Sequence, residues 1–149
     1  MNLLLSQIEE FIMLRSYAII GVSAQKKKFG NMILKNMIYR GFKLYPIHKK
    51  AGYIEGVKCF PDLRSLPEKP EGVILCVKPE ETEKLVLEIY DADIKNVWMQ
   101  QGSESNKAVE FCVINDIRVI SGQCMLMFLN NPGFPHNLHH WVWNLSHKN

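Results

Sequence analysis

Short apolar runs alternate along this chain with segments in which apolar residues recur every three or four positions. The runs are rich in Val, Ile, Leu and aromatic residues, and they lie at 17–22, 44–47, 72–77, 96–99 and 118–120. Runs of this length that are apolar at successive positions are typical of strands buried on both faces of a parallel sheet. The sequence therefore predicts five buried strands.

The segments between the runs have the period of a helix. They predict helices at about 2–14, 31–41, 80–90 and 104–115, with one helical turn at 62–66. Pro79 precedes the third of these, and three glutamates follow it, which favours a helix start at that point. We expect residues 52–61 to form a turn-rich connection.

Strands that alternate with helices of this length indicate a parallel sheet with helices on both faces. The predicted fold class is α/β, a Rossmann-like three-layer sandwich with a mostly parallel five-stranded sheet. A chain of 149 residues without a long linker is predicted to be one domain, 1–149. Its last segment, about 128–149, holds four of the five histidines and two tryptophans, and we expect a loop followed by a short helix there.

Charge and apolar content narrow the class of partner. The formal net charge is only +3, which is too small for the strong basic stripe of a nucleic-acid-binding protein. No apolar run approaches the ~18 residues that span a bilayer, and the N-terminal segment lacks the features of a signal peptide. The four cysteines form no CxxC pair and are expected to be buried free thiols in a reducing compartment. We therefore expect a cytoplasmic protein that binds neither nucleic acid nor membranes.

Ligands of an open parallel sheet bind at the carboxyl ends of its strands. After the first strand come Gly21, Val22 and Ser23, and then Gly30 and Asn31 at the start of a helix. Glycines permit a close backbone approach, and the N–H groups of a helix start attract phosphate. Lys27, within a run of three lysines, adds positive charge to the same loop. This loop is the predicted phosphate site.

The end of the second strand bears on the kind of nucleotide. Pro46 and Ile47 lead to His48 and two lysines, with no acid to hold the ribose hydroxyls of NAD. The six residues between Ser23 and Gly30 also depart from the GxGxxG pattern of NAD sites. A basic strand end suits a ligand with an additional phosphate on its ribose, and this argument leaves NADP and coenzyme A (CoA) both open.

Catalytic and metal-binding groups are not evident in the sequence. The strand ends carry no carboxylate pair and no Ser/His/Asp set, and Cys76 lies in an apolar run that predicts a core thiol. His136 and His140 share a helical spacing, yet no HExxH glutamate or cysteine pair completes a zinc site. We assign no catalytic residue and no metal ligand, and we expect the tail to pack or to form a homodimer.

Several blocks of sequence resemble the stand-alone CoA-binding domain proteins, which are related to the nucleotide-binding domain in the alpha subunit of succinyl-CoA synthetase. The blocks span about 15–127, and they include Ala18–Ser23, Phe29–Asn31, Tyr45–Ile47, Gly56–Leu63, Val77–Pro79, Val97–Glu104 and Gly122–Met125. The resemblance implies a Rossmann-like fold that binds CoA.

The resemblance also implies roles for individual residues. Gly21, Val22, Ser23 and Lys27 would meet the phosphates. The adenosine portion would be flanked by the two segments Pro46, Ile47, His48 and Val77, Lys78, Pro79. Gln101 and Gly102 would line the far side, and His48 stands where the family usually has asparagine.

Two functions of different classes fit these observations. The first is a module that binds CoA or an acyl-CoA without catalysis of its own. The alternative is a small NADP-dependent oxidoreductase that uses the same basic strand end. A third reading, an interaction protein that associates through its His- and Trp-rich tail, depends on the tail alone.

Overall fold

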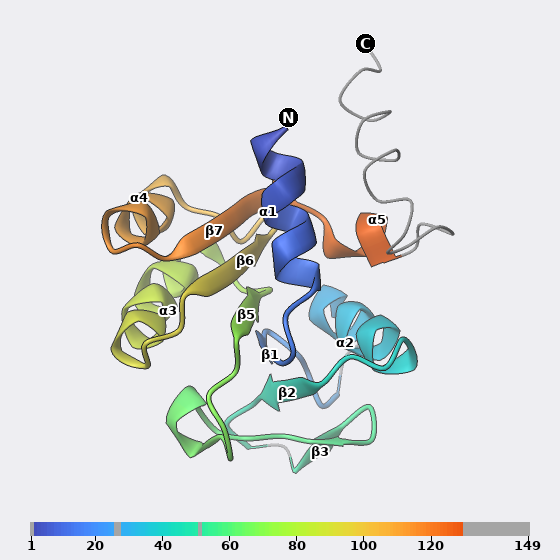
Figure 1. Ribbon diagram of the computed structural model, residues 1–149. Coiled ribbons are helices and arrows are strands. Elements are labelled where there is room, and N and C mark those ends of the chain that lie inside the picture. The colour runs from blue at the N-terminus through green and yellow to red at the C-terminus, as the bar shows by residue number, and fades with distance from the viewer. Residues whose placement is uncertain (1, 26–27, 51, 130–149) are drawn as a thin grey trace.

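The computed structural model describes residues 2–25, 28–50 and 52–129 (Figure 1). Five strands form one parallel sheet: β1 (Tyr17–Ile20), β2 (Leu44–Ile47), β5 (Gly72–Leu75), β6 (Asn96–Gln100) and β7 (Arg118–Gln123). Their order across the sheet is β2-β1-β5-β6-β7, and each neighbouring pair is parallel. The five strands predicted from the apolar runs are therefore confirmed.

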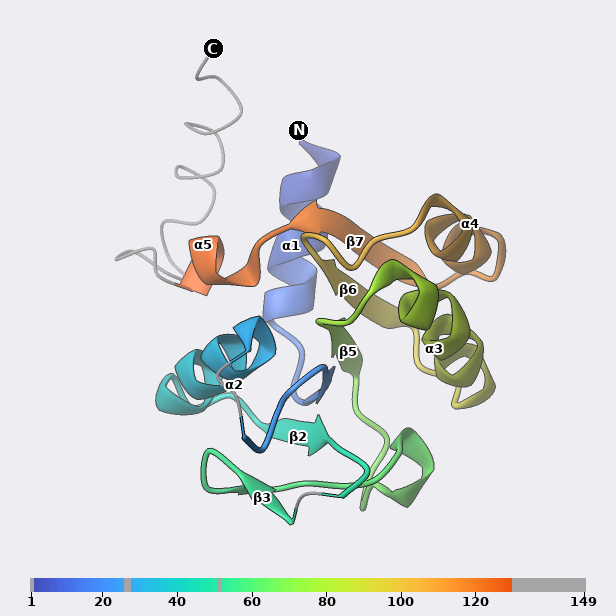
Figure 2. The same cartoon turned by 180° about the vertical axis from the view of Figure 1, so that it is seen from behind.

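Helices cover both faces of this sheet (Figures 1 and 2). They are α1 (Leu3–Ile12), α2 (Phe29–Tyr39), α3 (Pro79–Asp91), α4 (Asn106–Ile114) and α5 (Met125–Leu129). One core cluster joins α1, α2 and α5 to alternate strand residues such as Ile19 and Trp98. A second joins α3 and α4 to the intervening residues, such as Ala18 and Val97. Successive residues of a strand point to opposite faces of the sheet, so each strand contributes to both cores. The three layers are those of the predicted Rossmann-like α/β sandwich.

The structure corrects several predicted boundaries. The predicted strands 17–22 and 72–77 end two residues early. The backbone has a positive φ at Gly21, and after β5 it bends at Val77, one residue beyond the bond from the Cys76 amide to the Ile20 carbonyl. The last strand runs to Gln123 instead of residue 120, since Gln123 pairs with Gln100 beyond an irregularity in the ladder. The predicted helix at 31–41 begins two residues earlier than expected, and the one at 104–115 begins two residues later.

Two short elements were missed. The connection at 52–61 contains a hairpin, β3 (Tyr53–Ile54) and β4 (Val57–Lys58). The helical turn predicted at 62–66 is confirmed as the 3-10 turn η1 (Leu63–Ser65). The hairpin lies beside the β2 edge, where the amide of His48 donates to the carbonyl of Phe60 at 2.9 Å. The second missed element is α5, which includes the first two residues of the predicted tail, whereas residues 130–149 lie outside the described part of the chain.

The N-terminal helix is held to the sheet by one buried side chain. The Tyr17 hydroxyl donates to the carbonyls of Phe11 (2.6 Å) and Ile12 (2.8 Å), which end α1. The rings of Tyr17 and Trp98 lie 5.3 and 5.4 Å from the ring of Phe11. None of the helices in the described ranges is long and apolar enough to cross a membrane.

Candidate functional site

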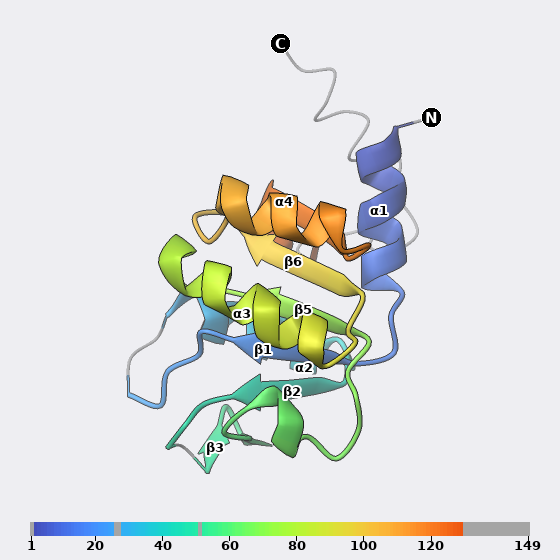
Figure 3. The same ribbon diagram turned by 90° about the vertical axis from the view of Figure 1, so that its left-hand side faces the viewer.

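The order of the strands reverses between β1 and β5. From β1 the chain crosses to β2 on one side, and it later returns to β5 on the other side of β1. The strands are parallel, so their carboxyl ends share one edge of the sheet (Figure 3). Ligands of such sheets bind in the crevice at this reversal, between the loops that follow the two strands. This point is where the predicted phosphate loop lies.

Two glycines bring the backbone of the loop close to its neighbours. Gly21 has φ 111°, and a Cβ built on it would overlap the carbonyl of Cys76 at the end of β5. A Cβ on Gly30, in the first turn of α2, would overlap the carbonyl of Gly21. The ends of β1 and β5 and the start of α2 are therefore in direct backbone contact, which only glycine permits at these two positions.

The loop is also held by a side chain. The side-chain nitrogen of Asn31, Nδ2, donates to the backbone carbonyl of Ser23 at 2.8 Å. The backbone N–H of Ser23 donates in turn to Oδ1 of Asn31 at 2.8 Å. The Ser23 hydroxyl accepts from the amide of Gln25 at 3.3 Å. Asn31 is only 5% exposed. Of the residues assigned to phosphate contact, Asn31 thus faces the protein, and Lys27 lies outside the described residues.

Two helix starts next to the reversal lack side-chain caps. Lys28 is the N-cap of α2 and Lys78 is the N-cap of α3, and neither side chain accepts a hydrogen bond from the first turn of its helix. By contrast, Asn2 caps α1 and Ser105 caps α4 through side-chain oxygens. An uncapped start presents free N–H groups and the positive end of the helix dipole.

Lys28 and Lys78 are both exposed, so each start places a cation beside the end of its helix. α3 begins with Pro79, which has no N–H, and carries Glu80 and Glu81 in its first turn, so the start of α2 is the more favourable of the two for an anion.

The remaining residues assigned to the second and third strand ends lie at the same edge. Pro46 and Ile47 are buried within β2, and His48, just beyond it, is half-buried and accepts from the amide of Lys50 at its Nδ1 (3.1 Å). Val77 is half-buried against the α3 face, and Pro79 is the first residue of α3. The Val22 side chain is 6% exposed and packs in the core, so of this loop residue only the backbone is left for contact with a ligand.

Gln101 and Gly102 follow β6, on the side of β5 away from β1. The amide of Gln101 donates to the carbonyl of Gln123 at 3.2 Å, and the amide of Gly102 donates to Glu104 Oε2 at 2.7 Å. Both residues are exposed. They lie at the predicted edge, two strands away from the first loop.

The sequence reasoning did not single out Gln100 or Lys28. Gln100 is 2% exposed and accepts from the amide of Met125 at 3.0 Å, which fixes the start of α5 beside β6. A polar residue that directly ends an apolar run was the available signal for Gln100. Lys28 was only one of three adjacent lysines, and its position as an N-cap needed the helix boundary.

The thiols near the site are poor nucleophiles. Burial, with a smaller effect from the nearby Cys124 thiol, raises the pKa of Cys76 to about 12. Burial likewise raises the pKa of Cys112 to about 11. A thiol with such a pKa carries little thiolate at neutral pH. Within the described residues, no three His, Cys, Asp or Glu side chains gather to hold a metal ion.

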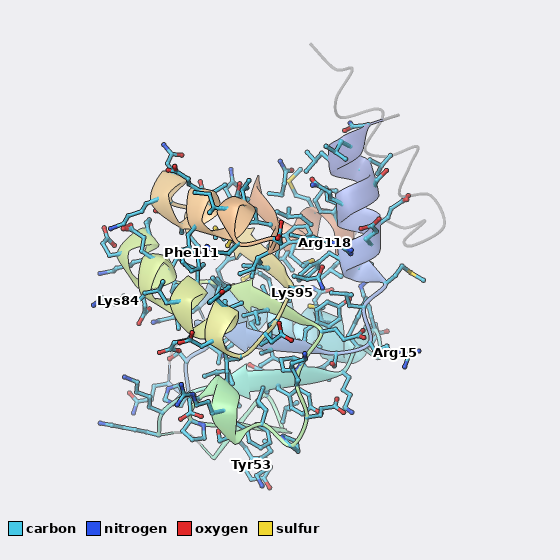
Figure 4. The ribbon with its side chains drawn as sticks, turned by 60° about the vertical axis from the view of Figure 1, so that its left-hand side comes forward. Arg15, Tyr53, Lys84, Lys95, Phe111 and Arg118 are labelled. Carbon is cyan, nitrogen blue, oxygen red and sulfur yellow. The ribbon has the colours of Figure 1, made fainter. Side chains whose placement is uncertain are left out.

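A separate hollow lies at the opposite, amino-terminal end of β7. Its lining includes Gln7, Glu10 and Arg118, and Arg118 Nη1 lies 3.6 Å from Glu10 Oε2 beside α1 (Figure 4). The only cation of its lining is thus already paired with a carboxylate. This hollow lacks the phosphate-type loop that distinguishes the carboxyl edge.

The fold is that of a Rossmann-like α/β domain, with two helix starts that lack side-chain caps beside its reversal point. The chain belongs to the CoA binding domain family, whose model matches residues 15–130.

Relatives extend this assignment. The alpha subunit of an ADP-forming acetate–CoA ligase II from Pyrococcus furiosus is 25% identical over 129 residues, which is 79% of this chain and 28% of that protein. The chain spans less than a third of the curated relatives it matches.

Solved structures include relatives of similar size. A conserved hypothetical protein from Pyrococcus furiosus has a TM-score of 0.71 and 30% identity, over 76% of this chain and 97% of that one. A hypothetical protein from Pyrococcus horikoshii has a TM-score of 0.77 and 22% identity, over 95% and 93% of the two chains. The second likeness, at this identity, concerns the fold alone.

Proposed function

We propose that this chain binds CoA or an acyl-CoA at the reversal point and does not itself catalyse a reaction. The observation that carries the proposal is the pair of uncapped helix starts, α2 and α3, each with a lysine as N-cap, on adjacent strands of a CoA-binding-family domain. The diphosphate of CoA would bind there. His48 and the lysines after β2 would bind the ribose phosphate, with Gln101 and Gly102 farther along the edge.

The absence of catalysis is argued from the same edge. Cys76 is the thiol closest to the first loop, and its raised pKa leaves it protonated at neutral pH. We therefore propose a binding module that supplies CoA, or reports on it, for a separate activity.

Thermal unfolding with a ligand panel tests this proposal. The panel contains CoA, acetyl-CoA, dephospho-CoA, NADP, NAD and ATP at matched concentration. A ligand that binds only the folded chain, present at ~100 times its Kd, adds about 2.7 kcal/mol of stability. We expect a shift with CoA and acetyl-CoA and a smaller one with dephospho-CoA, which lacks the ribose phosphate. A shift with NADP alone would replace the proposal by the oxidoreductase, and no shift with CoA would end it.

A charge variant on α3 tests the position of the site. Lys78→Ala removes the lysine at the start of α3, and Lys84→Ala removes an exposed lysine farther along the same helix (Figure 4). We expect Lys78→Ala to weaken CoA binding several-fold and to reduce its salt dependence, because one cation no longer meets phosphate. Lys84→Ala should bind as the wild type does. Equal losses in both variants, measured by calorimetry at two salt concentrations, would contradict a site at α3.

A further inference from the structure

The Asn31–Ser23 pair joins the two ends of the first loop. Ser23 is three residues beyond β1, and Asn31 is the third residue of α2. Both polar atoms of the Asn31 side chain bond to the backbone of Ser23, one as donor and one as acceptor, each at 2.8 Å. The described residues between them, 24–25 and 28–30, include the α2 start where we propose that phosphate binds.

The Asn31 side chain is almost completely buried, at 5% exposure. Each of its two polar atoms already has a partner at 2.8 Å, and its burial leaves little of the side chain accessible to a ligand. The N–H of Ser23 is likewise used by Asn31. A role for Asn31 at the site must therefore act through the shape of the loop.

We propose that Asn31 is a positioning residue that holds the first loop in its phosphate-binding shape before the ligand arrives. This inference rests on the proposed function. The glycine contacts at Gly21 and Gly30 fix where the loop leaves β1 and where it enters α2. The Asn31–Ser23 pair fixes Ser23 relative to the first turn of α2, so that the ligand does not have to bring the two together.

The expected effect follows from the population of the ordered loop. Two hydrogen bonds with a net contribution of about 0.5–1.5 kcal/mol each correspond to about 5-fold to about 150-fold in an equilibrium constant, and tenfold lies toward the lower end of that range. When the binding-competent fraction falls tenfold, the apparent Kd rises by the same factor. Loss of the pair should thus weaken CoA binding about tenfold although no ligand contact is removed.

The test combines CoA affinity with hydrogen exchange at the Ser23 amide, measured by NMR on the full chain. Asn31→Ala removes both bonds, and Asn36→Ala changes the same residue type on the same helix, where the structure shows no side-chain hydrogen bond. In Asn31→Ala we expect about tenfold weaker CoA binding. We also expect faster Ser23 exchange in the free protein, with protection restored on CoA binding. Asn36→Ala should match the wild type in both measurements.

A second variant guards against a general loss of folding. Asn31→Asp keeps an acceptor for the Ser23 N–H, and a carboxylate in the first turn favours the helix. Its Ser23 amide should stay protected. If the wild type binds CoA and Asn31→Ala binds it equally well, or exchanges at Ser23 no faster, the inference is overturned and the proposed function stands. If the wild type binds no CoA, the proposed function fails together with the affinity effect, while the exchange data still report whether Asn31 orders the loop.

Discussion

Single residues decide how closely the first loop approaches β5. Gly21 and Gly30 allow backbone contact where any side chain would overlap a carbonyl, and Asn31 bonds to the loop from α2. Gly41 also has positive φ, at 86°, yet a Cβ there meets nothing within 4 Å. Gly21 and Gly41 therefore allow the effect of a positive φ on stability to be separated from the effect of a close backbone contact.

Gly21→Ala should lower the free energy of unfolding by about 3 kcal/mol or more, because it adds an unfavourable φ to an overlap with the backbone of Cys76. Gly41→Ala should cost about 1–2 kcal/mol, from the left-handed backbone alone. Urea unfolding of both variants measures the difference. Equal costs would show that the close approach at Gly21 is relaxed at little expense.

Buried thiols predict a pH dependence of stability. The pKa of Cys112 is raised from 9.0 to about 11 by burial, so above pH 9 the unfolded chain loses this proton before the folded chain does. Stability is therefore complete below pH 9 and falls as the pH rises toward 11. The stability advantage of the wild type over Cys112→Ala should shrink by about 2 kcal/mol between pH 8 and pH 10.5. A difference that stays constant over this range, in urea unfolding, would contradict the assignment.

At the scale of elements, the attachment of α1 to the sheet is the clearest case. The helix ends at Ile12, and the Tyr17 side chain on β1 is completely buried. Its hydroxyl lies within hydrogen-bond distance of two of the last carbonyls of α1, those of Phe11 and Ile12. Desolvation of this hydroxyl raises the pKa of Tyr17 above its ordinary value. The neutral phenol is thus the form that holds α1 in place.

Tyr17→Phe should cost about 1–3 kcal/mol of stability, since the one hydroxyl proton shared by the Phe11 and Ile12 carbonyls is lost while the ring packing is kept. The Phe11 carbonyl still accepts from the amide of Leu14 at 3.2 Å, so the loss falls mainly on the Ile12 carbonyl. Tyr39→Phe removes the hydroxyl of a 90% exposed side chain and should change stability by less than about 0.5 kcal/mol. Thermal unfolding compares the two variants. A Tyr17→Phe chain as stable as Tyr39→Phe would mean that water replaces the lost donor.

At the scale of the whole molecule, the two edges of the sheet differ. The β2 edge is followed by the segment through Phe60, whose amide donates to the carbonyl of Pro46 at 3.0 Å. β7 is the other edge strand, and α1 packs near it.

The association of two chains through the His- and Trp-rich tail is predicted from the sequence alone. The cytoplasmic location likewise stays a prediction.

The tail prediction is tested by the oligomeric state. We expect the full chain to be a homodimer, because Trp141 and Trp143 offer large apolar area for an interface. A chain that ends at Leu129 keeps α5 and should be a monomer. Analytical ultracentrifugation of both chains measures this. Two dimers, or two monomers, would remove the tail from the interface.

The sequence by itself determined the five strands, the main helices and the edge of the sheet at which we propose the site. These follow from apolar period and strand polarity, which are local properties, and strand residues such as Ile19 and Val97 are apolar because both faces are covered. The resemblance in the motifs around Gly21 and Gly102 likewise gave the family, which the match over 15–130 confirms.

Only the tertiary structure decided which groups meet at that edge. Gly21 lies against Cys76, which is 55 positions later in the chain, because β5 pairs with β1. The local pattern of apolar residues does not specify the order of the strands in the sheet. The same holds for Asn31, whose side chain could equally have faced a ligand until its bonds to Ser23 were seen. Hydrogen bonds and close approaches between distant segments arise from packing, and packing depends on the whole chain at once.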